Sequence, residues 1–184
     1  MQINLVTSNL NKVREFKAIL GSKIKINHIE MHYKELRSDS NEEIAIESAE
    51  RLAKQLKKNV VVEDSGLFID ALNGFPGACS AFVHKRIGLN GILKLMEGSK
   101  DRTCYYNSAV AYCEPNKKAT SFSVTEKGLI SEKIKGIHGF GHDSIFIPQG
   151  SKKTYGEIEN CEIIKKFRRI AVLKLKNYLL SKKA

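Results

Sequence analysis

Val60-Val61-Val62-Glu63-Asp64-Ser65-Gly66 is the segment from which the fold is most directly predicted. Three consecutive valines are typical of a strand buried on both faces, in the middle of a sheet that helices cover. The strand is expected to end at Glu63 to Gly66, because Ser65 and Gly66 are common in turns. Ligand sites in α/β sheets gather at the carboxyl ends of strands, so Glu63 and Asp64 are the first candidate site residues.

Helical and extended patterns alternate along the rest of the chain. The expected elements of the first half are a strand at 3–6, a helix carrying Val13, Phe16 and Leu20, a strand at 24–28, and helices at 44–56 and 88–96. Those of the second half are strands at 105–112, 120–126 and 129–135, turns at 114–116 and 126–128, and an amphipathic helix from Ile163 to Tyr178. We therefore predict a mixed α/β fold with a long central sheet, formed by residues 1–184 as a single domain.

The composition argues against several classes of protein. The chain has 184 residues, of which 42% are hydrophobic, and this length suffices for one well-buried domain. No apolar run approaches the ~18 residues of a membrane span, and the first residues do not resemble an export signal. The four cysteines form no CxxC pair and are expected to be reduced. We therefore expect a cytoplasmic protein with no membrane partner.

A formal net charge of +11 favours polyanionic partners such as nucleotides, nucleic acid or an acidic lipid surface. Much of the excess lies in lysine pairs that are expected to be solvated, among them Lys57-Lys58, Lys117-Lys118 and Lys165-Lys166. The net charge by itself therefore indicates only that the ligand is an anion.

The loop Thr7-Ser8-Asn9-Leu10-Asn11-Lys12 joins the first expected strand to the first expected helix. Backbone N–H groups and the positive end of the helix dipole favour an anion at such a position. With Lys12 as a point charge, the loop is a candidate cradle for a polyphosphate. The alternative is an ordinary helix N-cap, for which Ser and Asn are common residues, and the loop taken alone favours that alternative.

The adjacent carboxylates of Glu63 and Asp64 are candidate ligands for Mg²⁺, which prefers oxygen ligands and retains several waters. One such water can act as the nucleophile, and Asp64 can take its proton. A polar turn at the end of a strand is the alternative interpretation. Glu35, or else Glu42 or Glu43, could complete the metal site. For the last two, a favourable interaction with the dipole of the following helix is the better explanation.

The segment from Gly139 to Phe146 combines glycines, an aromatic ring and an acid before an expected strand. A purine base offers a face for stacking and polar edges for hydrogen bonds, and the side chains of Phe140, His142 and Asp143 suit both tasks. The alternative is a glycine-bearing turn with Phe140 in the core. The segment is therefore a candidate base-binding loop.

In this order, the segments resemble the motifs of the Ham1-type inosine triphosphate pyrophosphatases, which act on ITP, dITP and XTP. The T-G-N-x-x-K loop of that family corresponds to residues 7–12, and its D-D-S-G-L segment corresponds to residues 63–67. Its A-L-N-G-x-P-G, G-F-G-Y-D-P-I-F and T-x-A-E motifs correspond to 71–77, 139–146 and 154–157. These motifs, in the correct order, span most of the chain.

The resemblance implies an elongated two-lobed mixed sheet with flanking helices, a nucleotide cleft between the lobes, and usually a homodimer. It implies hydrolysis of non-canonical purine nucleoside triphosphates to the monophosphate and pyrophosphate, with Mg²⁺. Asp64 and Lys12 would be catalytic and must therefore lie in one site, and Glu35 and Asp64 would bind the metal. The residues assigned to the substrate are Thr7, Ser8, Asn9, Lys12, Ser65, Phe140, Gly141, His142, Asp143 and Arg168.

Several positions depart from the family motifs. Ser8 replaces a glycine, which is tolerated unless φ is positive there, and His142 replaces Tyr or Trp and could titrate near neutral pH. Lys166-Phe167-Arg168 replaces S-H-R, and the basic residue expected in the second helix is displaced to Arg51. Two alternatives follow from these departures. One is an impaired relative that binds nucleotides or nucleic acid through its basic surface, and the other is a pyrophosphatase with a shifted base preference.

Overall fold

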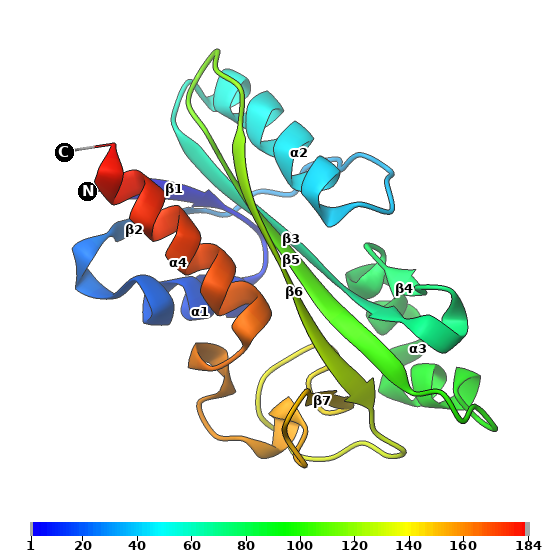
Figure 1. The fold of residues 1–184 in the computed structure, drawn as a ribbon. Coiled ribbons are helices and arrows are strands. Elements are labelled where there is room, and N and C mark those ends of the chain that lie inside the picture. The colour runs from blue at the N-terminus through cyan, green and yellow to red at the C-terminus, as the bar shows by residue number, and fades with distance from the viewer. Residues whose placement is uncertain (1, 183–184) are drawn as a thin grey trace. The chain divides into compact units, whose positions relative to one another are not determined.

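The computed structural model describes residues 2–182, which form a mixed α/β fold built on a seven-stranded sheet (Figure 1). The strands are β1 (Gln2–Val6), β2 (Lys25–Ile29), β3 (Val60–Ile69), β4 (Pro76–Gly77), β5 (Thr103–Cys113), β6 (Thr120–Ile130) and β7 (Phe146–Pro148). The α-helices are α1 (Leu10–Leu20), α2 (Asn41–Leu56), α3 (Ser80–Leu95) and α4 (Lys166–Ser181). Short 3-10 helices lie at Gly21–Lys23, Asp70–Leu72, Tyr155–Glu157 and Cys161–Ile163.

The sheet has the strand order β2-β1-β3-β5-β6-β7, and β4 pairs with β3 outside this path. Strand β1 runs parallel to β2 and to β3, whereas the β3–β4 and β6–β7 pairs are antiparallel. The predicted mixed α/β class is therefore confirmed. Within residues 2–182, no helix is both long enough and apolar enough to cross a membrane.

The chain divides into two compact units. The first unit contains the described residues up to Asp64 together with 108–124 and 168–182, and the second contains 65–107 and 125–167. The chain passes from one unit to the other inside β3, β5, β6 and α4. Each unit has its own buried apolar core, so each can be described by itself.

The core of the first unit lies on both faces of its part of the sheet. Val61 packs with residues of α1 and α4 on one face, and Val60 and Val62 pack with residues of α2 on the other (Figure 1). Successive side chains of a strand point to opposite faces, which explains why three valines in a row are all buried. The strand predicted to be buried on both faces is confirmed.

Strand β3 does not end at the carboxylates, so the turn predicted there is wrong. It continues to Ile69, because Leu67 and Phe68 pair with Gly77 and Pro76 of β4. A Cβ atom on Gly66 would lie 2.2 Å from the carbonyl oxygen of Gly77. The glycine therefore permits a close approach of two backbones rather than a turn.

The strand predicted at 129–135 is wrong for a similar reason. A single strand, β6, continues through the expected turn at 126–128, and Gly128 pairs with Pro148 of β7. A Cβ atom on Gly128 would lie 2.5 Å from the carbonyl oxygen of Ile147 and 2.6 Å from the ring of Phe146. The helix predicted at 88–96 begins earlier, at Ser80, and Gly88 interrupts it with a φ of 62°.

Candidate active site

The loop after β1 is organised by Asn9, which is the N-cap of α1. Its Oδ1 accepts hydrogen bonds from the backbone N–H groups of Asn11 and Lys12, at 3.0 and 3.3 Å. The hydroxyl oxygen of Thr7 accepts a bond from the backbone N–H of Asn9, at 3.1 Å. The N-cap interpretation is therefore confirmed for Asn9. The described non-glycine residues with positive φ are Lys57, Asn73, Asn116 and Asn160, so Ser8 replaces the family glycine without backbone strain.

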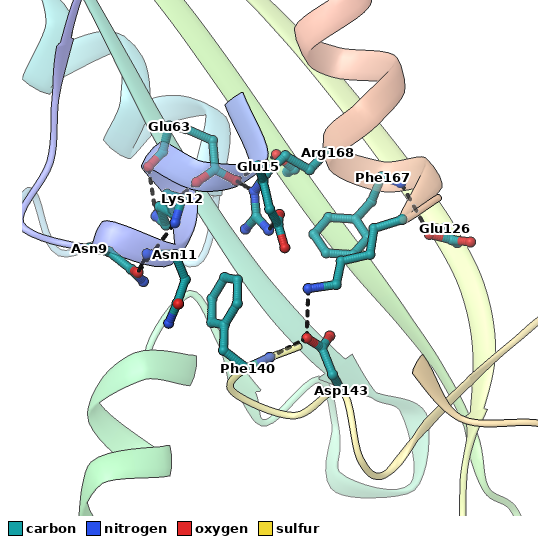
Figure 2. A network of polar contacts seen from close by, with 12 residues as sticks. Asn9, Asn11, Lys12, Glu15, Glu63, Glu126, Phe140, Asp143, Phe167 and Arg168 are labelled. Carbon is teal, nitrogen blue, oxygen red and sulfur yellow. Dashed lines mark hydrogen bonds and ion pairs between the residues drawn. The ribbon is translucent and has the colours of Figure 1, made fainter. Parts of the chain in front are cut away.

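Capping orients Lys12 toward β3. Its Nζ lies 2.8 Å from the backbone oxygen of Glu63 and 2.8 Å from Oε2 of the same residue (Figure 2). The two residues are 51 positions apart in the chain, and both belong to the first unit. The structure thus places the cation of the loop beside the carboxylates of β3, as the sequence analysis requires of Lys12 and Asp64.

Glu63 is held by two cations and a hydroxyl group, and its Oε2 makes the ion pair with Lys12 but no hydrogen bond within the described residues. Its Oε1 accepts hydrogen bonds from the Ser108 hydroxyl at 2.7 Å and from Nε of Arg168 at 3.1 Å. Arg168 also pairs with Glu15 (Figure 2). Burial opposes the ionisation of Glu63, but Arg168 and Lys12 outweigh it and lower the pKa to about 2. Glu63 is therefore an anion that organises Lys12 and Arg168.

Asp64, the next residue, is in a different state. It is buried, and burial raises the pKa of its carboxyl to about 6, because it outweighs the lowering effects of Lys12 and of the hydrogen bond from Asn41. The charges of Glu63 and Glu35 raise the pKa further by smaller amounts. Its Oδ2 accepts a hydrogen bond of 2.7 Å from Nδ2 of Asn41. A carboxylate with a pKa near neutrality is suited to accept a proton from water at physiological pH.

The acidic residues near Asp64 fit a hard divalent cation. Glu35 is exposed and its charge raises the pKa of Asp64, which places it within electrostatic range. Oδ1 of Asn41 is buried and has no hydrogen-bond partner. No group of three or more His, Cys, Asp or Glu side chains that could hold a metal occurs within residues 2–182. This donor set suits an ion such as Mg²⁺, which binds one or two carboxylates and keeps its waters for substrate phosphates.

The other acids considered for the metal accept hydrogen bonds from serine hydroxyls instead. Glu42 and Glu43 lie in the first turn of α2. Glu42 accepts a hydrogen bond from Ser121, and Oε2 of Glu43 accepts one of 2.7 Å from Ser38. Their predicted position at the positive end of the helix dipole is confirmed.

The second unit contains a separate cluster around the 139–146 loop. Oδ2 of Asp143 accepts a hydrogen bond of 2.6 Å from the backbone N–H of Phe140 (Figure 2). It also lies 2.6 Å from Nζ of Lys165, and that Nζ is 4.5 Å from the centroid of the Phe140 ring. The side chain of Lys165 is only 1% exposed, so the prediction of a solvated lysine pair is wrong for this residue. Ion pairing and the aromatic face together compensate for its burial.

His142 in the same loop is also buried. Its ring contacts that of His84 edge to face, with 5.2 Å between the centroids, and its Nε2 has no hydrogen-bond partner. Burial, assisted by His84, lowers the pKa of His142 to about 3. The expectation that it titrates near neutral pH is therefore wrong, because a buried site disfavours the charged imidazolium.

The remaining residues singled out in the sequence are Gly141, Ser65, Phe167 and Arg51. Gly141 has a φ of 64° and permits the bend between Phe140 and His142. Ser65 is half-buried in β3. Phe167 stacks on Tyr106 with 4.4 Å between centroids and is a core residue of the second unit. Arg51 donates hydrogen bonds to Glu47 and to the carbonyl of Lys34.

Four residues of these clusters were not predicted from the sequence, namely Glu15, Asn41, Ser108 and Lys165. Asn41 and Ser108 lie in segments whose pattern predicts only a helix start and a strand. Lys165 is one member of a lysine pair in the sequence, and no local pattern there indicates that it is buried.

Comparisons with known proteins agree with these features. The model of the Ham1 family matches residues 3–178. The chain is 46% identical to a dITP/XTP pyrophosphatase of Methanopyrus kandleri, with 89% of each chain covered. It is 43% identical to one of Pyrococcus horikoshii, with 86% and 85% covered. The fold is similar to that of the Staphylococcus aureus Ham1 protein, with a TM-score of 0.81, 26% identity, and coverage of 98% of this chain and 100% of the other.

Proposed function

Because this chain belongs to the Ham1 family, we propose that it hydrolyses non-canonical purine nucleoside triphosphates, such as ITP, dITP and XTP, to the monophosphate and pyrophosphate. Similar proteins bear the name dITP/XTP pyrophosphatase. The observation that carries the proposal is the contact of Lys12 with Glu63, directly beside the protonatable Asp64. Residues 1–184 act in this proposal as one pyrophosphatase domain.

Lys12 binds the polyphosphate in this proposal. An ammonium group has three N–H donors. Lys12 donates one of them to the backbone oxygen of Glu63 at 2.8 Å, and its Nζ forms an ion pair with Oε2 of the same residue at 2.8 Å. An N–H group of Lys12 remains for a phosphate oxygen, and the loop from Thr7 to Asn9, in which Ser8 is exposed, supplies further polar groups. The positive charge steadies the pyrophosphate leaving group as negative charge develops on it.

Asp64 and Glu35 bind the divalent ion, which we propose to be Mg²⁺. When bound, the ion supplies a Lewis acid for the phosphate oxygens and lowers the pKa of its water. Asp64 accepts the proton of the attacking water, which its raised pKa favours. Glu63, paired with Lys12 and Arg168, keeps both cations in place and remains ionised.

The loop at 139–146 recognises the base in this proposal. Phe140 offers its ring for stacking, which is worth about 1–3 kcal/mol per base, and Lys165 and Asp143 fix the loop. The buried His142 is neutral at physiological pH and presents an unpaired Nε2, which a base edge could pair with. Ser65 and Arg168 complete the proposed contacts. We further propose a cytoplasmic homodimer, a state that light scattering after size exclusion would test.

Substitution of Asp64 tests this function. Asp64→Asn should reduce the turnover of ITP with Mg²⁺ roughly 10²–10⁴-fold, the range typical for loss of a general base. Release of pyrophosphate is the measurement, with circular dichroism to verify the fold. Asp70→Asn, at an exposed carboxylate of the second unit, is the matched control and should retain the full rate. An unchanged rate in Asp64→Asn would remove this residue from the mechanism.

A substrate panel addresses the replacement of the family histidine by the core residue Phe167. ITP, dITP and XTP should be hydrolysed with higher kcat/KM than ATP and GTP. Comparable rates for all five would show that ATP and GTP are not excluded. A higher kcat/KM with other modified or pyrimidine nucleotides would support the shifted base preference instead. Hydrolysis of none, with binding that weakens steeply in salt, would support the alternative of an impaired relative that binds polyanions.

A further inference from the structure

Asn41 is a buried side chain whose task is not explained by the helix in which it lies. It is the first residue of α2 and is 2% exposed. Ser40 is the N-cap, and its hydroxyl oxygen accepts the hydrogen bond from the backbone N–H of Glu43. The Asn41 amide is therefore not required for capping.

The Asn41 amide is instead directed at the candidate catalytic carboxylate. Its Nδ2 donates a hydrogen bond of 2.7 Å to Oδ2 of Asp64. The described residues supply no hydrogen bond to the other carboxylate oxygen, Oδ1 of Asp64. One bond of this kind restricts the rotation of the carboxylate and distinguishes its two oxygens.

The second observation is the unpaired oxygen of the same amide. Oδ1 of Asn41 is buried and has no hydrogen-bond partner within the described part of the chain. A buried acceptor without a donor is energetically unfavourable. A buried polar atom of this kind, beside a candidate metal ligand, points to a donor that arrives with the bound ion and substrate, and metal-bound water is such a donor.

We propose that Asn41 is a positioning residue for the reaction. Its Nδ2 holds Oδ2 of Asp64 so that Oδ1 of Asp64 is left for the divalent ion, and its own Oδ1 accepts a hydrogen bond from a water bound to that ion. This proposal rests on the proposed function and deepens it. Outer-shell partners of this type orient metal ligands, and their loss typically costs 10–100-fold in metal affinity or activity.

Asn41→Leu tests the proposal by removing both hydrogen-bonding atoms at similar volume. We expect kcat with ITP to fall 10–100-fold while KM changes less than about threefold. The dissociation constant for Mn²⁺, measured by electron paramagnetic resonance without turnover, should rise by a similar 10–100-fold. The matched control is Ser48→Ala, because Ser48 also lies in α2 with a buried, unpaired hydroxyl. It should leave kcat and Mn²⁺ binding unchanged.

Asn41→Asp separates the two roles and guards against a folding defect of the leucine variant. The aspartate keeps an acceptor for the water but cannot donate to Asp64 when it is ionised. We expect kcat to fall at least 10-fold while Mn²⁺ binding is as tight as in the wild type or tighter. Wild-type kcat in Asn41→Asp, or unaltered Mn²⁺ binding in a folded Asn41→Leu, would overturn the proposal. The proposed function would still stand in either case if Asp64→Asn is inactive.

Discussion

The two units bury ionic clusters of different composition. In the first unit, Glu63 is shared by Lys12 and Arg168, and Arg168 also pairs with Glu15. Asp64 beside them has no ion pair among the described residues. In the second unit, Asp143 and Lys165 pair against the ring of Phe140, next to a histidine that stays neutral. The first cluster suits a cation and phosphates, whereas the second suits an uncharged aromatic ring. The clusters that the two units bury therefore differ in ionic charge and in aromatic content.

The largest expected effect comes from removing one buried cation from each cluster. Arg168→Met and Lys165→Met should each lower the free energy of unfolding by about 3–5 kcal/mol, because each takes a cation away from a buried carboxylate. The loss should be greater for Arg168→Met, since both Glu15 and Glu63 lose a partner. Urea unfolding followed by circular dichroism is the measurement, as the chain contains no tryptophan.

Neighbouring residues provide matched controls for both variants. Arg169 and Lys166 are exposed, so Arg169→Met and Lys166→Met should change the free energy of unfolding by less than about 0.5 kcal/mol. Equal losses in the buried and exposed variants would show that burial of charge does not distinguish these positions. The comparison between the two clusters would then have no energetic basis.

A smaller effect tests whether His142, in the cluster of the second unit, stays neutral in the folded protein. A histidine whose pKa is lowered from 6.5 to about 3 by folding takes up a proton more readily in the unfolded state. Its contribution to stability is thus unchanged above pH 6.5 and is lost as the pH falls below that value. Between pH 7.5 and 5 the loss should be about 2 kcal/mol, from ~1.4 kcal/mol per pH unit. His142→Phe should remove this part of the pH dependence.

The measurement is the difference in unfolding free energy between wild type and His142→Phe at several pH values. Taking the difference cancels the contributions of Asp64 and Glu63, whose pKa values are shifted in opposite directions. A difference that stays constant between pH 7.5 and 5 would mean that the histidine is protonated in the folded protein. The second cluster would then resemble the first in bearing an unbalanced charge.

The fold could be predicted from the sequence wherever side-chain periodicity dominates. The valines at 60–62 and the helical spacing of Val13, Phe16 and Leu20 gave elements at the right places. The errors came from glycines. The local pattern predicts turns at Gly66 and Gly128, but these glycines let β3 meet Gly77 and β6 meet Ile147 at distances that exclude a Cβ atom. Such contacts depend on strand pairing between distant segments, which local pattern does not contain.

The site could be predicted only in part for the same physical reason. Lys12 and Asp64 can be identified from the sequence because each lies within a short continuous motif. Asn41 and Lys165 acquire their roles from partners far along the chain, Asp64 and Asp143. In the sequence, Asn41 is an ordinary helix-start residue and Lys165 an ordinary member of a lysine pair. Burial, which converts them into partners of carboxylates, is a property of the folded core.

The smallest expected effect comes from a third cluster, which lies at the surface of the first unit. Nζ of Lys182 is 2.9 Å from Oε1 of Glu114 and 4.8 Å from the centroid of the Tyr178 ring. Its side chain is 40% exposed, compared with 1% for Lys165. Both lysines thus have a carboxylate and an aromatic ring as partners, and burial is the main difference between them. Lys182→Met should therefore cost less than about 1 kcal/mol.

Added salt distinguishes the exposed ion pair of Lys182 from the buried ion pair of Lys165. The Lys182–Glu114 pair is exposed, so 0.5 M NaCl should largely abolish the difference between Lys182→Met and wild type in urea unfolding. The loss in Lys165→Met should persist at the same salt concentration, because the buried Asp143 is screened very little. A salt-resistant loss of several kcal/mol in Lys182→Met would show that the shared partners, rather than burial, determine the strength of both pairs. The contrast between buried and exposed charge, on which the assignment of the two inner clusters depends, would then fail.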